Sequence, residues 1–94
     1  MTQQGIIQAA KEIKAFYEQG VIKDIEFPPL VNKHTLEDVG MGVIFNLSTK
    51  FDYNEATIME WKEKLGADDW KVNAKLNQLF ITFYVHFKHN NEKA

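Results

Sequence analysis

Hydrophobic residues near the start of the chain recur at steps of three and four positions. Within residues 2–19 they are Ile6, Ala9, Ala10, Ile13, Phe16 and Tyr17, with glutamine, lysine and glutamate between them. This spacing places the apolar residues on one face of a helix. Gly20 follows, and glycine readily adopts the left-handed conformation that ends many helices. We therefore predict an amphipathic helix over residues 2–19.

Three further segments carry clear patterns. Residues 21–27 are rich in β-branched side chains and end at two prolines, which cannot extend a hydrogen-bonded ladder, so an edge strand is expected. Residues 41–51 alternate between apolar and mostly polar side chains, which predicts a strand with one buried face. Residues 52–55 offer a helix N-cap, and helical spacing then continues to Leu65, immediately before Gly66.

Residues 68–89 fit two periods. As a hairpin they give two alternating rows joined at Asn77 and Gln78. As a helix they align one apolar stripe of Val72, Leu76, Leu79, Phe80, Phe83 and Phe87. The Asn-Gln pair lacks the glycine that tight hairpins prefer, which favours the helix. We predict the order αββαα, with αββαββ and a four-stranded antiparallel sheet as the alternative. Both belong to the α+β class, as a single domain over residues 1–89 with a disordered tail at 90–94.

Composition narrows the possible functions. The 94 residues include no cysteine, and all eleven positive charges are lysines, set against thirteen acidic residues for a net charge of −2. Disulfides, cysteine-containing zinc sites and bidentate guanidinium contacts are therefore excluded. The beginning of the chain carries no signal-peptide pattern, and no apolar run approaches the about 20 residues that a membrane helix needs. We expect a cytoplasmic protein without membrane association.

Candidate chemistry is sparse. His86 and His89 would share one face of a helix at a spacing that suits two metal ligands, but the sequence fixes no third ligand. His34 lies near Glu37 and Asp38, yet no nucleophile accompanies them. We therefore predict no enzymatic activity, no catalytic residues, no metal site and no cofactor.

Aromatic residues are more numerous than a domain of this size needs for its core. Trp61 and Trp70 fall outside the main apolar stripes of their predicted helices, and Tyr84 adds apolar bulk beyond one stripe. Ile22 and Ile44, on the wetter sides of the predicted strands, add to this excess. Exposed apolar patches mark interaction surfaces. We predict a protein–protein interaction or regulatory module that forms a homodimer through an aromatic surface of Trp61, Trp70 and Tyr84.

The alternative is a DNA-binding protein. Residues 68–79 follow a predicted helix and Gly66 with the spacing of a helix-turn-helix. The exposed side of the second helix would present Lys71, Asn73, Lys75 and Asn77, and asparagine can pair with adenine. Against this stand two aspartates at the start of that helix, the negative net charge and the absence of arginine.

Overall fold

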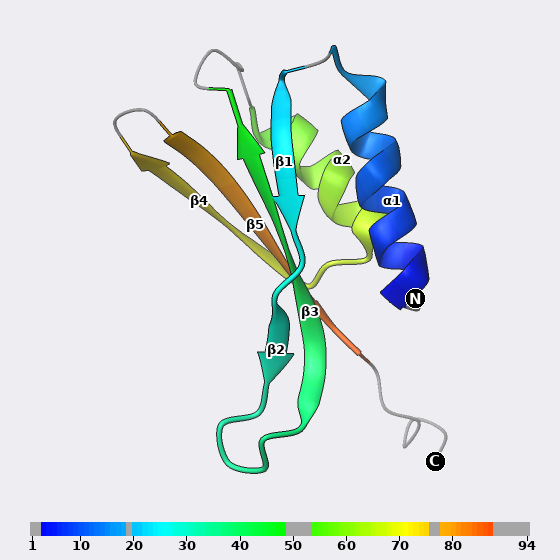
Figure 1. The fold of residues 1–94 in the computed structure, drawn as a ribbon, viewed down its shortest axis with the longest axis vertical. Helices are drawn as coiled ribbons and strands as arrows, with labels where there is room; N and C mark the ends of the chain where they lie inside the picture. Colours follow the sequence, from blue (N-terminus) through cyan, green and yellow to red (C-terminus); the bar gives the residue numbers. More distant parts are fainter. Residues whose placement is uncertain (1–2, 19, 49–53, 76–77, 88–94) are drawn as a thin grey trace.

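The computed structural model describes residues 3–18, 20–48, 54–75 and 78–87. These residues form two helices and five antiparallel strands (Figure 1). In chain order they are α1 (Gln3–Phe16), β1 (Ile22–Glu26), β2 (Pro29–Val31), β3 (Asp38–Leu47), α2 (Glu55–Leu65), β4 (Asp69–Lys75) and β5 (Gln78–His86). The predicted α+β class and single domain are confirmed. The predicted tail at 90–94 lies outside the described residues.

The strand order in the sheet is β1-β3-β5-β4, and β2 pairs with the other end of β3. Strands β1 and β2 are thus two pieces of one edge, because both pair with β3 and only residues 27 and 28 separate them. Pro28 remains beside β3, since its carbonyl oxygen accepts a hydrogen bond from the Gly42 N–H at 2.7 Å. The predicted edge strand is confirmed over Ile22–Glu26, but the edge does not stop at the prolines, because Pro29 is paired with Met41 in β2.

The last segment is a hairpin, so the predicted single helix over residues 68–89 and the order αββαα are wrong. Strand β5 is hydrogen-bonded on both sides, to β3 and to β4. Its core is the run from Ile81 to Val85, whose β-branched and aromatic side chains favour strands. The alternative order αββαββ describes the structure, except that the prolines split the edge strand and give five strands instead of four.

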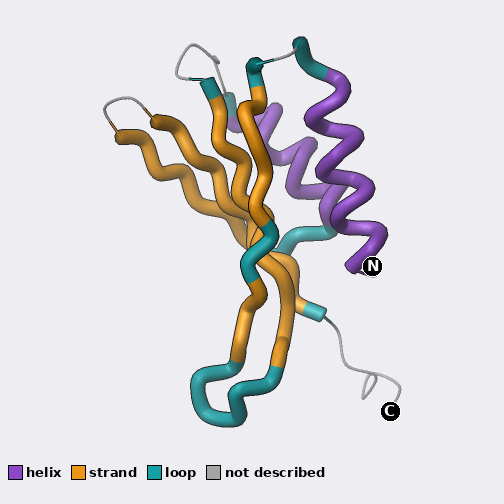
Figure 2. Tube along the Cα trace, in the orientation of Figure 1, coloured by secondary structure: helices purple, strands orange, loops and turns teal. Residues whose placement is uncertain are grey.

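Both helices pack on the same face of the sheet (Figures 1 and 2). Helix α1 buries Ile6, Ala10 and Ile13 there, and α2 buries another apolar trio. The ring of Trp61 lies 5.0 Å from that of Phe45, between centroids. The core contains no buried polar residue among those described. Its members are Ile6, Ala10, Ile13, Ile22, Met41, Val43, Phe45, Leu47, Ile58, Trp61, Leu65, Leu79, Ile81, Phe83 and Val85.

The helix ends follow from local chemistry. Helix α1 ends at Phe16, earlier than predicted, and a turn leads to Gly20, which has a φ of 94°. Helix α2 begins after Asn54, whose Oδ1 accepts a hydrogen bond from the Thr57 N–H at 2.9 Å. It ends at Gly66, as predicted, with a φ of 69° in the left-handed region.

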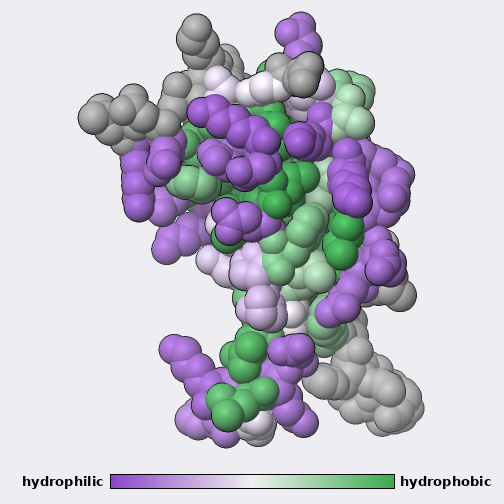
Figure 3. Space-filling view, in the orientation of Figure 1, coloured by the Kyte–Doolittle hydropathy of each residue, from purple (hydrophilic) through white to green (hydrophobic). Residues whose placement is uncertain are grey.

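Strand β2 and the first half of β3 extend beyond the helices as an arm (Figure 1). The loop at its tip is built around Asn32, whose side chain accepts hydrogen bonds from the N–H groups of His34 and Thr35. Leu36 is 76% exposed and Val31 43% exposed, and hydrophobic surface is visible on this arm in Figure 3.

Candidate functional site

The predicted aromatic surface of Trp61, Trp70 and Tyr84 is not one surface. Trp61 is 2% exposed and belongs to the core, because it lies three residues after Ile58 on the buried stripe of α2. Trp70 is half-buried opposite Phe83, on the side of the sheet that the helices cover. Tyr84 points to the other side. The expectation that the three residues share a surface is therefore wrong, and so is the expectation that Trp61 is accessible.

Tyr84 lies on the face of the sheet opposite the two helices, which we call the open face (Figure 2). Alternate residues of each strand point there. On β5 and the second half of β3 these residues are partly exposed, whereas their strand neighbours are buried. Ile22, which we expected on a wetter side, is buried, whereas Ile44 is on the open face. The open face comprises Asp24 and Glu26 of β1, Ile44 and Asn46 of β3, Phe80, Thr82 and Tyr84 of β5, and Asp69, Lys71, Asn73 and Lys75 of β4.

The centre of the open face is apolar. Phe80 and Tyr84 project from the same strand, four residues and about 13 Å apart. Ile44 is paired with Thr82, which lies between them. Ile44 is thus a diagonal neighbour of both rings across the two central strands, and each of the three side chains is partly exposed.

Polar groups surround this apolar centre, and their charges differ between its two sides. Asp24 and Glu26 lie on the β1 side, paired with Asn46 and Ile44. Lys71 and Lys75 lie on the β4 side, together with Asp69. An apolar centre with a polar rim is the usual composition of a protein interface.

The residues predicted to read DNA lie on a strand. Lys71, Asn73 and Lys75 belong to β4, and Asn77 lies outside the described residues. The predicted helix-turn-helix at 68–79 is therefore wrong, since the second helix does not exist. The strand nevertheless places all three residues on the open face, because they alternate along β4.

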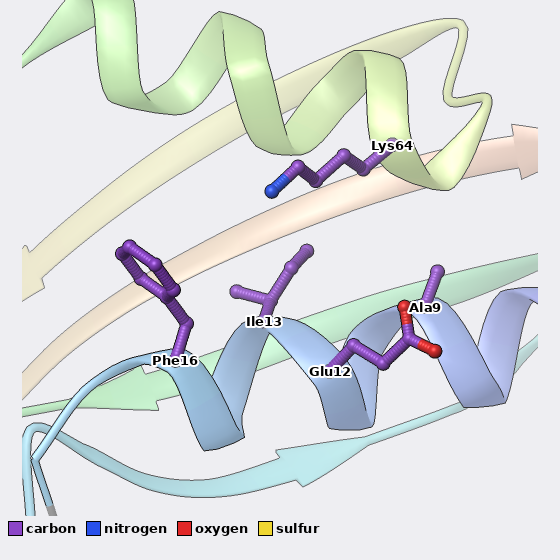
Figure 4. A pocket seen from close by; sticks show the side chains of 5 residues that line it. All are labelled: Ala9, Glu12, Ile13, Phe16 and Lys64. Atoms are coloured by element: carbon purple, nitrogen blue, oxygen red, sulfur yellow. The ribbon is translucent and has the colours of Figure 1, made fainter.

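An open groove lies between the two helices (Figure 4). Its volume is about 390 Å³, and it is lined by Ala9, Glu12, Ile13, Phe16 and Lys64. Phe16 is 79% exposed, and the Lys64 Nζ lies 6.0 Å from the centre of its ring. Lys64 also forms an ion pair with Glu60 at 3.5 Å. This groove is open, and its charged side chains do not converge on a common point, so it lacks the polar anchors of a small-molecule site.

His86 is held by Asp68. The Asp68 Oδ2 accepts a hydrogen bond from the His86 N–H at 2.9 Å and lies 2.9 Å from the ring Nδ1. The pair links the start of β4 to the end of β5. His89, the other candidate metal ligand, lies outside the described residues, and within the described part of the chain no three acidic or histidine residues are grouped to hold a metal ion.

The chain matches no protein-family model, and no curated protein and no solved structure is significantly similar to it. Neither of the described helices is long and apolar enough to cross a membrane. The candidate site therefore stands on its geometry alone.

Sequence reasoning missed Phe80 as a site residue. In the helical interpretation this residue belonged to the apolar stripe and was assigned to the core. The period-two pattern from Leu79 to Val85 carries the signal that separates it from its buried neighbours.

Proposed function

We propose that this protein is a non-enzymatic interaction module that binds a protein partner through the open face of its sheet. The observation that supports it is the partly exposed group of Ile44, Phe80 and Tyr84 on the central strands, on the face without helices and with polar side chains around it. Aromatic side chains contribute large contact areas and are enriched at protein interfaces. Of the three residues predicted to bind a partner, the proposal retains Tyr84.

The charged rim restricts how a partner can bind. Asp24 and Glu26 on one side attract basic groups, whereas Lys71 and Lys75 on the other attract acidic groups. Charge complementarity of this kind contributes to orientation and to the rate of association. The proposed partner surface is thus apolar at its centre, with a basic and an acidic side.

Site-specific photo-crosslinking tests the proposal. A benzophenone amino acid at position 84 should give a discrete protein adduct in cells that express the protein. The same group at position 16 is the matched control, because Phe16 is also an exposed aromatic residue but lies on α1, away from the open face. Identical adducts at both positions, or none at position 84, would contradict the proposal.

A double variant, Phe80→Thr with Tyr84→Thr, separates binding from folding. Threonine maintains strand propensity while it removes both rings. We expect the adduct formed from a benzophenone group at position 44 to disappear in this variant while the circular dichroism spectrum is unchanged. A persistent adduct would show that the rings do not contribute to binding.

Single-stranded nucleic acid is a second candidate ligand for the same face. Phe80 is paired with Asn73 and is diagonal to Lys71 and Lys75, and Lys71 is also diagonal to Tyr84. Aromatic rings with nearby lysines can stack bases and contact phosphates. The acidic residues Asp24, Glu26 and Asp69 on the same face oppose this binding. Fluorescence anisotropy with labelled single-stranded DNA and RNA at low salt distinguishes the candidates. An increase in anisotropy with protein concentration that added salt abolishes would favour nucleic acid. An anisotropy that does not change with protein concentration would exclude it.

The cytoplasmic location and the absence of enzymatic activity stay predictions from the sequence. Self-association also stays a prediction. The edge strand β4, and not the aromatic residues, offers the surface for it.

A further inference from the structure

The two edges of the sheet are built differently. The β1/β2 edge carries two register shifts, between Ile22 and Asp24 and between Leu30 and Val31, as well as two prolines. Bulges, prolines and charged side chains, lysines above all, are devices that prevent an edge strand from pairing with another chain. Strand β4 has no bulge and no proline: its seven residues pair with β5 in one unbroken register. It does carry Lys71 and Lys75, so a second strand can pair there only in a register that keeps like charges apart. In Figure 1 it is the outermost strand of the sheet.

The free hydrogen-bonding groups of β4 belong to alternate residues. The Phe87 N–H donates to the Val39 oxygen at 2.8 Å, so odd-numbered residues of β5 direct their N–H groups to β3 and even-numbered ones to β4. The even-numbered residues pair with Asp69, Lys71, Asn73 and Lys75, which therefore face β5. The outward groups are those of Trp70, Val72 and Ala74.

One hydrogen bond supports this assignment of directions. The Trp70 N–H donates to the Oδ1 of the adjacent Asp69 at 2.8 Å and not to β5. Among the described residues, no group bonds to the outward backbone of Val72 or Ala74. This edge can thus accept a further strand without losing any bond to β5.

We propose that β4 pairs antiparallel with β4 of a second copy of this chain, with Val72 on the two-fold axis. Val72 then lies opposite Val72 of the second copy, and Trp70 lies opposite Ala74. Each pair of outward residues exchanges two main-chain hydrogen bonds, and the two sheets become one. The pairing groups are the outward backbone groups of β4, and only the charged side chains of Asp69 and Lys75 are shared with the rim of the open face. The inference does not use Ile44, Phe80 or Tyr84, so it does not depend on the proposed function.

Charge selects this register. With Val72 at the centre, Asp69 lies opposite Lys75 of the second copy at both ends of the pairing. A shift that preserves the faces of the sheet moves the centre to Lys71 or to Asn73. The first alternative places Lys71 opposite its own copy, and the second places Lys71 opposite Lys75. Like charges directly opposite each other destabilise a strand pair, whereas opposite charges stabilise it.

The sizes of the opposed side chains favour the same register as their charges. The large Trp70 meets the small Ala74, on the helix side of the sheet, where Val72 meets its own copy. In the pair, the Trp70 N–H bonds to the Ala74 carbonyl of the second copy. The Asp69 carboxylate is then released from this N–H to bind Lys75.

Amide hydrogen exchange at increasing protein concentration tests the proposal residue by residue. The Lys71 and Asn73 amides face β5 and should be protected at every concentration. The Val72 and Ala74 amides should exchange freely in dilute protein and slow by about tenfold or more as the concentration enters the millimolar range. Fast exchange of Val72 and Ala74 at every concentration, with the other two amides protected, would overturn the proposal.

Charge exchange tests the register, with sedimentation equilibrium as the measurement. Asp69→Lys and Lys75→Asp should each raise the dissociation constant of the homodimer about tenfold, because each places like charges opposite each other twice. A mixture of the two single variants should restore the wild-type constant as a heterodimer, and the double variant should restore it as a homodimer. If neither the mixture nor the double variant restores the wild-type dissociation constant, this register is overturned.

A third variant identifies the edge itself. Val72→Pro removes an outward N–H that β5 does not use, so the fold should persist, as judged by the circular dichroism spectrum, while the dimer is lost. Tyr84→Thr is the control on the open face and should leave the dissociation constant unchanged. A dimer that survives Val72→Pro, or one that Tyr84→Thr dissociates, would place self-association elsewhere and overturn the proposal.

Discussion

The two faces of β5 differ in what covers them. Its odd-numbered residues from Leu79 to Val85 lie beneath the helices with at most 5% of their surface exposed, whereas the even-numbered residues between them are partly exposed. Both faces carry aromatic rings: Phe83 on the helix side, and Phe80 and Tyr84 on the open side. The comparison shows that residue type alone does not separate a buried aromatic residue from a partly exposed one. What separates them is the layer that covers each face.

The largest expected effect is on the helix side. Trp61→Ala should lower the free energy of unfolding by about 3–5 kcal/mol, because it removes the ring that packs against Phe45 and Phe83. Urea denaturation measures the change. Trp70→Ala is the matched control and should cost clearly less, since Trp70 is only half-buried at the sheet edge. Equal losses would show that the two sites are equally enclosed.

A smaller effect is expected where the backbones of β3 and β5 approach closely. A methyl group at Gly40 would overlap the carbonyl oxygen of Val85, so Gly40→Ala should cost about 1–3 kcal/mol. At Gly42 the nearest atom to such a group is the Pro28 Cγ at 3.1 Å, and Gly42→Ala should cost less. Thermal denaturation of the two variants measures the difference, and a more damaging change at Gly42 would contradict this geometry.

The N-cap of α2 tests how strongly the helical layer is held. Asn54→Ala removes the acceptor for the Thr57 N–H and should cost about 1 kcal/mol. Asn54→Asp retains an acceptor and is the control. Urea denaturation measures the free energy of unfolding of both variants. An equal loss of this free energy in the aspartate and alanine variants would show that the cap does not contribute.

The smallest expected effect is on the open face. Tyr84→Thr should change the free energy of unfolding by no more than about 0.5 kcal/mol, because the residue is partly exposed and threonine suits a strand. Phe83→Thr, one residue earlier, should be far more damaging, since Phe83 is fully buried. Similar urea midpoints for the two variants would remove the distinction between the faces.

Much of the fold could be predicted from local signals. The α1 stripe, the alternation from Met41 to Leu47 and the helix end at Gly66 reflect short-range chemistry, and the structure confirms them, whereas α1 ends at Phe16, before the predicted end at Gly20. The last segment could not be decided in this way, because both periods fit it. Strand β5 forms because β3 and β4 supply hydrogen bonds on both of its sides, and no window of residues 78–86 alone contains that information.

The candidate site was predicted less well than the fold. Tyr84 and Ile44 were placed correctly on a partly exposed surface, whereas Trp61 was misplaced because its position on the buried stripe of α2 was not recognised. Lys71, Asn73 and Lys75 were assigned to a helix, yet their alternation on β4 also aligns them on one face. A face of a sheet is assembled from strands far apart in the sequence, so its composition depends on the register.

The strand order also determines when the sheet can assemble. Strand β5 is the last described element in the chain, yet it lies at the centre of the sheet, between β3 and β4. During synthesis, β3 emerges with one side unpaired, and the Phe45 and Val43 side chains have no β5 neighbours until the last strand has left the ribosome. Pairing of β3 with β5 must also close a loop that includes α2, which slows folding relative to the local β4–β5 hairpin. The hairpin therefore has time to form first, and the sheet becomes continuous only when β5 joins β3.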